Sequence, residues 1–189
     1  MRYQPLRHCW DERTLRPVYF DLETIRARIA TLEVELAPLN SRRPPKTRLP
    51  NELRMLHEHL ELFAASGSVS TARAIAQGIG QRAQRARSQI YLSRVLQADL
   101  DTCQGDYVSA TLSFIELLNM AGEAPRSVQA VAYLRAGRCE FAQEMWAEAA
   151  ASFAAAAEAA RGARLPVASA AEIRFAHKCA QAHLQGAVT

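Results

Sequence analysis

Three stretches of the chain carry the same pattern of small, apolar and aromatic residues at nearly equal spacing. Their anchoring alanines, Ala72, Ala110 and Ala149, lie 38 and 39 residues apart. Further apolar or small residues follow each alanine at helical spacing and place one apolar stripe on each helix. A period of this length is typical of proteins built from stacked structural repeats. One unit alone leaves its stripe exposed, so the units must stack.

The same reading predicts helices throughout residues 51–185. Asn51 caps the first helix, which carries Leu53, Leu56, Leu60 and Phe63 on one face. The helices that follow are expected at about 70–86, 88–104, 107–121, 127–143, 147–161 and 167–185. The last one has no pairing partner and would cover the open end of the stack.

The repeated residues resemble the tetratricopeptide repeat family. The third unit matches that family's signature at Tyr133, Ala136, Gly137, Ala149, Phe153 and Ala156, with Trp146 at the turn between its helices. The middle unit keeps Gly105, Tyr107, Ala110 and Phe114, and has Ala98 where glycine is usual. The first keeps Gly67 and Ala72. The period exceeds the usual one and is similar to longer-helix variants of bacterial signalling proteins.

The resemblance implies an all-α fold, a right-handed stack of three antiparallel helical hairpins with a capping helix. It also implies that peptides or helices bind in the groove made by the first helix of each pair. The polar residues of those helices that we expect in the groove are Arg94, Asp101, Arg135 and Arg138. One subclass clamps a C-terminal carboxylate with lysine and asparagine at fixed positions. The matching residues here include Asp99 and Arg138, so that clamp is not expected.

Residues 1–50 read as a separate N-terminal extension. Residues 1–16 show no period and are expected to be irregular. A helix is expected from Pro17, which suits a first turn, to Ala37, before Pro38 stops it. Residues 38–50 contain four prolines and read as a semi-rigid linker. The extension holds ten basic and six acidic groups, so it carries the net charge of +4.

The helix of this extension carries an apolar heptad pattern, interrupted only by the flanking prolines. Its residues are Leu15, Val18, Leu22, Ile25, Ile29, Leu32, Leu36 and Leu39. One hypothesis is a short parallel coiled coil between two copies of the chain, made by Leu22, Ile25, Ile29, Leu32 and Leu36. In that homodimer Asp21 would face Arg26, and Arg28 would face Glu33 of the other copy. The alternative is that the stripe docks on the repeats of its own chain.

No motif in the chain supports catalysis, and we expect no enzyme, no metal and no cofactor. His57 and His59 are two residues apart and point to different sides of a helix, so they cannot share zinc. Cys179 and His183 could share an ion, but metal sites need three or four ligands. The four cysteines contain no CxxC pair and are expected as reduced thiols. No apolar run could span a membrane, no secretory signal is present, and a cytoplasmic location is expected.

These observations favour a non-catalytic protein–protein interaction module, the sensory or oligomerisation part of a bacterial regulatory protein. They leave open whether the chain is a fragment of a longer one. An alternative is a small chaperone of the same repeat type for secreted or assembly subunits. A third reading, which we do not favour, is nucleic-acid binding through the linker and an arginine-rich face. That face comprises Arg73, Arg82, Arg85, Arg87 and Arg94.

Overall fold

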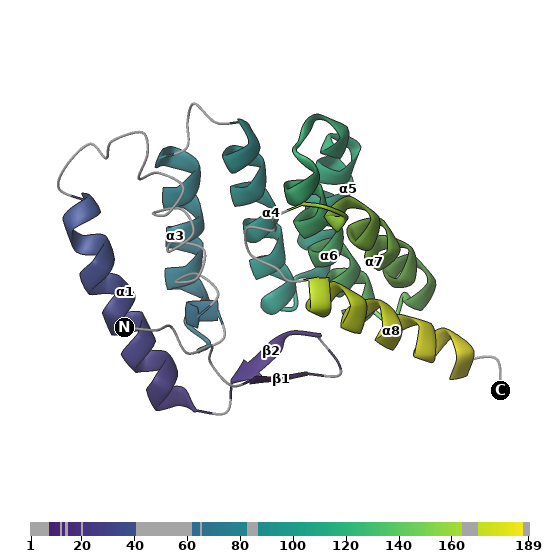
Figure 1. Ribbon diagram of the computed structural model, residues 1–189, viewed down its shortest axis with the longest axis horizontal. Helices are drawn as coiled ribbons and strands as arrows, with labels where there is room; N and C mark the ends of the chain where they lie inside the picture. The colour runs from purple at the N-terminus through teal and green to yellow at the C-terminus, as the bar shows by residue number, and fades with distance from the viewer. Residues whose placement is uncertain are drawn as a thin grey trace.

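The helices lie side by side in a row in the computed structural model of the chain (Figure 1). It describes residues 8–11, 13, 15–19, 21–40, 62–64, 66–82, 87–163 and 170–186. The regular elements among these residues are helices apart from one short two-stranded ribbon, so the expected helical class is confirmed for the body of the chain. None of the helices described is both long and apolar enough to cross a bilayer.

The helices from residue 69 onward follow the predicted bounds closely. They are α3 (Val69–Arg82), α4 (Arg87–Cys103), α5 (Tyr107–Asn119), α6 (Arg126–Ala142), α7 (Trp146–Ala160) and α8 (Ala170–Gly186). A single 3-10 turn, η1 (Ala121–Glu123), lies in the longer connection before α6. Of the helix predicted to begin at Asn51, only the helical residues 62–64 are described; Leu53, Leu56 and Leu60 lie outside the described residues.

Three helix ends share one backbone geometry at the period of the sequence. Gly67, Gly105 and Glu144 are left-handed, with φ of 81°, 78° and 62°. At each, the left-handed residue donates its N–H to the carbonyl three residues back, and the next residue donates to the carbonyl five residues back. This is the Schellman motif, which satisfies carbonyls that a helix end would leave without donors. Asp106 then caps α5 by accepting from Ser109 N at 3.2 Å.

Packing follows the predicted apolar stripes. Helices contact their neighbours along the chain, α3 with α4, α4 with α5, α6 with α7 and α7 with α8, and α6 also contacts α4 and α5. The anchoring alanines of α3, α5 and α7 are fully buried. Ala76, Phe114 and Phe153, each four residues further on, are buried as well.

A glycine sets the distance between α6 and α7. A Cβ added at Gly137 would lie 2.6 Å from Cε1 of Phe153, closer than any normal contact. The helices therefore approach as closely as they do because residue 137 has no side chain. The middle unit has Ala98 at the corresponding place, buried in the same cluster as Phe114.

The N-terminal extension differs from the prediction. Residues His8–Trp10 (β1) and Pro17–Tyr19 (β2) form an antiparallel ribbon, with His8 opposite Tyr19 and Trp10 opposite Pro17. The expectation of irregular structure is wrong at residues 8–10, and the expectation of a helix from Pro17 is wrong. Pro17 instead begins a strand, where its missing N–H also costs little. Val18, assigned to the heptad, lies in that strand.

The helix of the extension, α1, spans Leu22–Asn40 and so begins five residues later than predicted and continues past Pro38. Asp21 precedes it and accepts hydrogen bonds from the N–H of Glu23, at 2.9 Å, and from the hydroxyl of Thr24. These bonds lower the pKa of Asp21, with the Thr24 hydroxyl the main cause. The carboxylate thus satisfies the first turn of α1.

Candidate functional site

Charged side chains from three helices meet in the interior of the molecule. Asp99 of α4, Arg135 and Arg138 of α6, and Glu172 of α8 are 2%, 1%, 1% and 9% exposed. Helix α6 contacts both α4 and α8, which brings these residues onto one continuous face. Charged groups are almost never buried this fully without partners, because removing them from water is costly.

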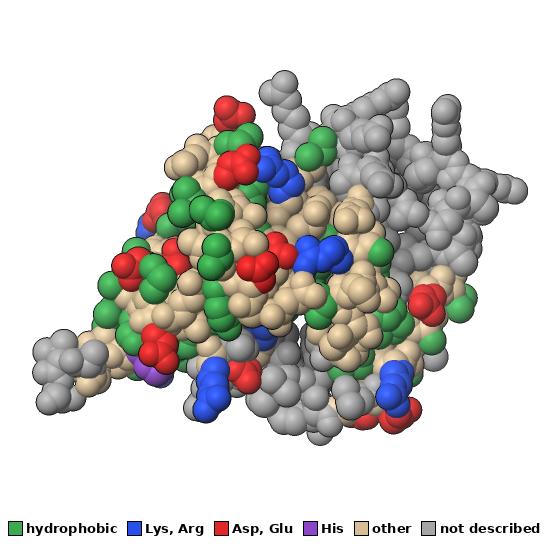
Figure 2. Space-filling model, turned by 180° about the vertical axis from the view of Figure 1, so that it is seen from behind, with side chains coloured by type: hydrophobic (Ala, Val, Ile, Leu, Met, Phe, Trp, Pro, Cys, Tyr) green, Lys and Arg blue, Asp and Glu red, His purple; other side chains and the backbone are tan. Residues whose placement is uncertain are grey.

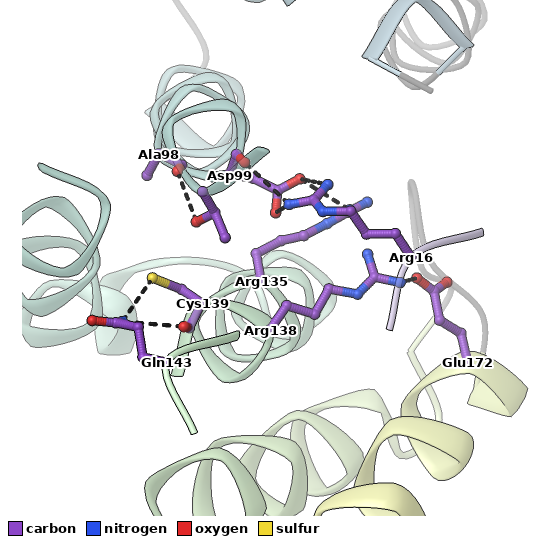
Figure 3. Close-up of polar contacts among 9 residues, drawn as sticks. Arg16, Ala98, Asp99, Arg135, Arg138, Cys139, Gln143 and Glu172 are labelled. Carbon is purple, nitrogen blue, oxygen red and sulfur yellow. Dashed lines mark hydrogen bonds and ion pairs between the residues drawn. The ribbon is translucent and has the colours of Figure 1, made fainter. Parts of the chain in front are cut away.

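A residue of the N-terminal extension completes this set of charges. Arg16 follows the turn of the ribbon and reaches Asp99, 83 residues away (Figure 3). Its Nη2 donates to Asp99 Oδ1 at 2.7 Å and to the Asp99 carbonyl oxygen at 3.1 Å, and its Nη1 donates to Oδ2 at 3.1 Å. We call Arg16, Asp99, Arg135, Arg138 and Glu172 the charged cluster.

Leu15 enters the same region beside Arg16. Its side chain is 1% exposed and belongs to a buried apolar cluster with Leu134 and Phe141 of α6 and Ile173 of α8. Its backbone is left-handed, with φ of 52°, a conformation that is strained for a bulky residue. Two hydrogen bonds close the turn, from Leu15 N to Asp11 O and from Asp11 N to Arg16 O, both 2.8 Å. Packing and the turn together hold Leu15 in this conformation.

The two guanidiniums of α6 have different environments. Arg135 Nη1 donates to Asp99 Oδ2 at 3.1 Å, so Asp99 lies between Arg135 and Arg16. Arg138 Nη2 donates to Glu172 Oε1 at 2.5 Å. Nε and Nη1 of Arg138 are buried and have no acceptor among the described residues. Buried donors without acceptors are rare in proteins and each has a free-energy cost.

The electrostatics of the cluster follow from its count of charges, three guanidiniums against two carboxylates. Burial alone would raise the pKa of Asp99, but Arg135 and Arg16 outweigh it and hold that pKa below its ordinary value. Burial lowers the pKa of Arg138, Glu172 opposes that change, and Arg135 adds to it. For Arg16 burial acts to lower the pKa, yet Asp99 more than compensates and the pKa is raised.

The structure places the four residues predicted for the groove in different surroundings. Arg135 and Arg138 lie in the charged cluster. Asp101 instead pairs with Arg73 of α3 at 2.7 Å. Arg94 pairs with Glu116 of α5 at 2.8 Å, and both side chains are largely exposed.

Sequence reasoning did not select Asp99, Arg16 or Glu172. The repeat period could have indicated Asp99. It precedes Arg138 by 39 residues, so it occupies in the middle unit the position that Arg138 occupies in the third. Arg16 and Glu172 lie outside the regular period and carry no comparable signal.

The part of the apolar stripe of α1 whose side chains are described is covered by the chain itself. Ile25, Ile29 and Leu32 are buried in a cluster with Leu62, and Phe63 packs against it. This is the self-docking arrangement, and it leaves these three side chains no face for a second copy. The side chains of Leu22 and Leu36 lie outside the described residues. Dimerisation of the chain stays a prediction.

The arginines proposed for nucleic-acid binding are only partly described. Arg73 and Arg94 each pair with a carboxylate. The side chains of Arg82, Arg85 and Arg87 and the linker lie outside the described residues. On the face shown in Figure 2, the basic side chains of the described part lie singly among acidic and hydrophobic ones.

The histidine and cysteine side chains that the structure describes form no metal site. In the part of the chain that the structure describes, no three His, Cys, Asp or Glu residues are placed to hold a metal ion. His183 stacks on Trp146, with ring centroids 4.3 Å apart, and an open hollow of about 400 Å³ lies beside them. His57 and His59 lie outside the described residues.

A scan of protein-family models and searches of curated proteins and of solved structures found no match to this chain. The resemblance to the tetratricopeptide family therefore stays a prediction carried by the residues that suggested it.

Proposed function

We propose that this chain is a non-catalytic protein–protein interaction module of the tetratricopeptide type, with a right-handed stack of helical hairpins. In this proposal it is the sensory or oligomerisation region of a cytoplasmic bacterial regulatory protein. Peptide segments bind to the face that α4, α6 and α8 share. The regulatory setting and the cellular location rest on the family resemblance alone.

The repeated backbone geometry supports the stacked-hairpin part of the proposal. The left-handed residues Gly67, Gly105 and Glu144 recur at intervals of 38 and 39 residues, as do the buried alanines that follow them. Helices α4 and α6 are each the first helix of a pair, and they contact one another directly. In a stack of hairpins the first helices of neighbouring units line one common face.

The charged cluster carries the binding part of the proposal. Helices can pack against one another with apolar residues alone, and replacing a buried ion pair by apolar residues is often neutral or stabilising. An apolar set of similar size could therefore also hold α4, α6 and α8 together, so helix packing alone does not explain why these positions carry charges. In addition, Nε and Nη1 of Arg138 have no acceptor among the described residues, and a carbonyl or carboxylate of a peptide would satisfy them. Both features support a role of this cluster in recognising another chain.

Selection of peptides displayed on phage tests the proposal. The full chain is immobilised and random peptides are selected on it. The same peptides are then measured on the double variant Arg138→Met/Glu172→Met, which replaces an ion pair by apolar side chains of similar size and should keep the fold. Leu112→Ser serves as the control, because Leu112 is 65% exposed on α5.

Enriched peptides should lose at least about tenfold in affinity on the double variant, roughly the 1.4 kcal/mol of one lost polar contact, and none on the control. Failure to enrich any peptide on the native chain and on the variant Arg16→Lys, which weakens the contact of Arg16 with Asp99, would contradict the proposal. Equal affinity for the native chain and the double variant would contradict it as well. Circular dichroism at near-ultraviolet wavelengths checks that each variant retains its packing.

A further inference from the structure

The turn of the ribbon contacts the charged face as a bound peptide would. Leu15 fills an apolar site made by α6 and α8, and Arg16 engages both the carboxylate and the carbonyl of one residue, Asp99. Apolar anchoring by one side chain and charge-assisted hydrogen bonds by the next are common means of peptide recognition. The two contacts come from adjacent residues, so they define a recognition unit of two positions.

We propose that the face formed by α4, α6 and α8 recognises segments in which a bulky apolar residue is directly followed by an arginine. The chain's own Leu15 and Arg16 occupy that site and compete with such a partner. This inference rests on the proposed function and adds to it the chemistry of the partner and an internal competitor.

The geometry explains why arginine is required at the second position. Two nitrogens of Arg16 donate in parallel to the two oxygens of Asp99, at 2.7 and 3.1 Å, and one of them also reaches the backbone carbonyl. A planar guanidinium can make these bonds together, whereas the ammonium group of lysine is a single point of charge. A lysine peptide should therefore bind at least about tenfold more weakly.

The position of the segment in the chain explains why it competes. A segment of the same chain meets the site at an effective concentration that does not depend on the protein concentration, unlike a separate partner. A partner then binds only the fraction of molecules whose site is open, and its apparent dissociation constant rises in proportion. Weakening the contact of Arg16 with Asp99 should therefore open the site without changing the residues of α4, α6 and α8 that form it.

The experiment measures fluorescence anisotropy with a labelled peptide of residues 8–19, acetylated and amidated at its ends. The peptide carries both strands of the ribbon and the turn between them. The proteins are the full chain, the full-chain variant Arg16→Ala, and the full-chain variant Arg16→Lys, which keeps the charge opposite Asp99. Arg13→Ala is the matched control, because Arg13 is exposed in the same turn.

The peptide should bind Arg16→Ala and Arg16→Lys at least about tenfold more tightly than it binds the native chain or Arg13→Ala. Peptides with Arg16→Lys or Leu15→Ser should bind every protein more weakly than the native peptide. If Arg16→Ala loses its near-ultraviolet circular dichroism, Arg16→Lys alone decides the result.

Equal affinity of the peptide for the native chain and for Arg16→Lys, or equal affinity of the lysine and arginine peptides, would overturn the inference. The proposed function survives that outcome if phage-selected peptides still depend on Arg138 and Glu172. The absence of any peptide selected on the native chain and on Arg16→Lys, in which the site should be open, overturns the proposed function itself, so the two failures are separate results.

Discussion

Glu144 occupies a backbone position that the other two repeats give to glycine. Its φ of 62° corresponds to 81° at Gly67 and 78° at Gly105. A side chain in the left-handed region costs about 1 kcal/mol or more, a cost that glycine does not have. The difference between the three turns is therefore one of residue type and not of geometry.

Glu144→Gly should raise the free energy of unfolding by about 0.5–1 kcal/mol, because it removes this strain at an exposed turn. Gly105→Ala should lower it by about 1 kcal/mol for the opposite reason, since no atom lies within 4 Å of the added Cβ and only the backbone is strained. Urea unfolding followed by circular dichroism measures both. A Glu144→Gly protein less stable than the native chain would show that Glu144 makes a contact of greater value than the strain.

The buried carboxylate of Asp99 predicts a specific dependence of stability on pH. Burial opposes its ionisation, but Arg135 and Arg16 prevail and its pKa in the folded chain lies below its ordinary value. The ionised group therefore stabilises the fold above the unfolded-state pKa of about 3.9, and this contribution is lost as the pH falls through the lower folded-state pKa.

Asp99→Asn should lower the free energy of unfolding at pH 7 by about 3–5 kcal/mol, because it leaves buried guanidiniums without their counter-charge. It should also weaken the loss of stability on acidification below about pH 4. Urea unfolding at pH 7 and at about pH 3 measures both effects. The control is Asp106→Asn, in an exposed cap position where asparagine serves equally well. An equal effect of the two substitutions would contradict the role given to Asp99.

At the scale of elements, α1 is the helix whose role the structure changes. Its heptad pattern is real, but the buried part of it packs on Leu62 of the same chain. Ile25→Asp/Ile29→Asp should therefore undock α1, with lower thermal stability, and leave the solution mass the same as that of the native chain. Light scattering measures the mass. Val34→Asp is the control, since Val34 lies on the same helix and is 73% exposed.

A native mass of twice 20.9 kDa that falls to 20.9 kDa in the double variant would instead establish the heptad as a dimer seam. An unchanged mass together with a lower melting temperature agrees with self-docking. The Val34 substitution should change neither quantity.

The elements that sequence reasoning located are those with enough residues to show a period. Helices α3 to α8 each have 13 or more residues, so their apolar stripes are unambiguous. The strands of the ribbon have three residues each, too few for an alternating pattern to be distinguished from chance. The heptad pattern also led the prediction to extend the helix over the second strand, because Leu15 and Val18 continue its spacing although neither belongs to α1.

The site was predicted only in part for a related reason. Arg135 and Arg138 stand out as polar residues on a helix that the sequence predicts to be the first of its pair. Arg16 contacts Asp99 across 83 positions, and no local sequence pattern predicts a contact between residues so far apart in the chain. Whether a charged residue is exposed or buried in an ion pair depends on what packs over it, which a single sequence does not show.

At the scale of the whole molecule, α6 is the centre of the arrangement. It contacts α4, α5, α7 and α8, and it contributes residues to two of the three described core clusters and two members of the charged cluster. Each other helix described from α3 onward depends on its neighbours for burial, as expected where contacts are between successive units. The N-terminal turn is the exception, since it joins the stack at a distance in sequence.

That exception affects the order in which the chain can complete its fold during synthesis. Leu15 packs in one cluster with Ile173, Ala176 and Ala180 of α8, which are made much later. At 5–20 residues per second the interval is roughly 10–30 s, far longer than a helix needs to form. Over that time Leu15 and Arg16 have no finished binding place, and the nascent turn is open to chaperones, proteases or any other protein that recognises it.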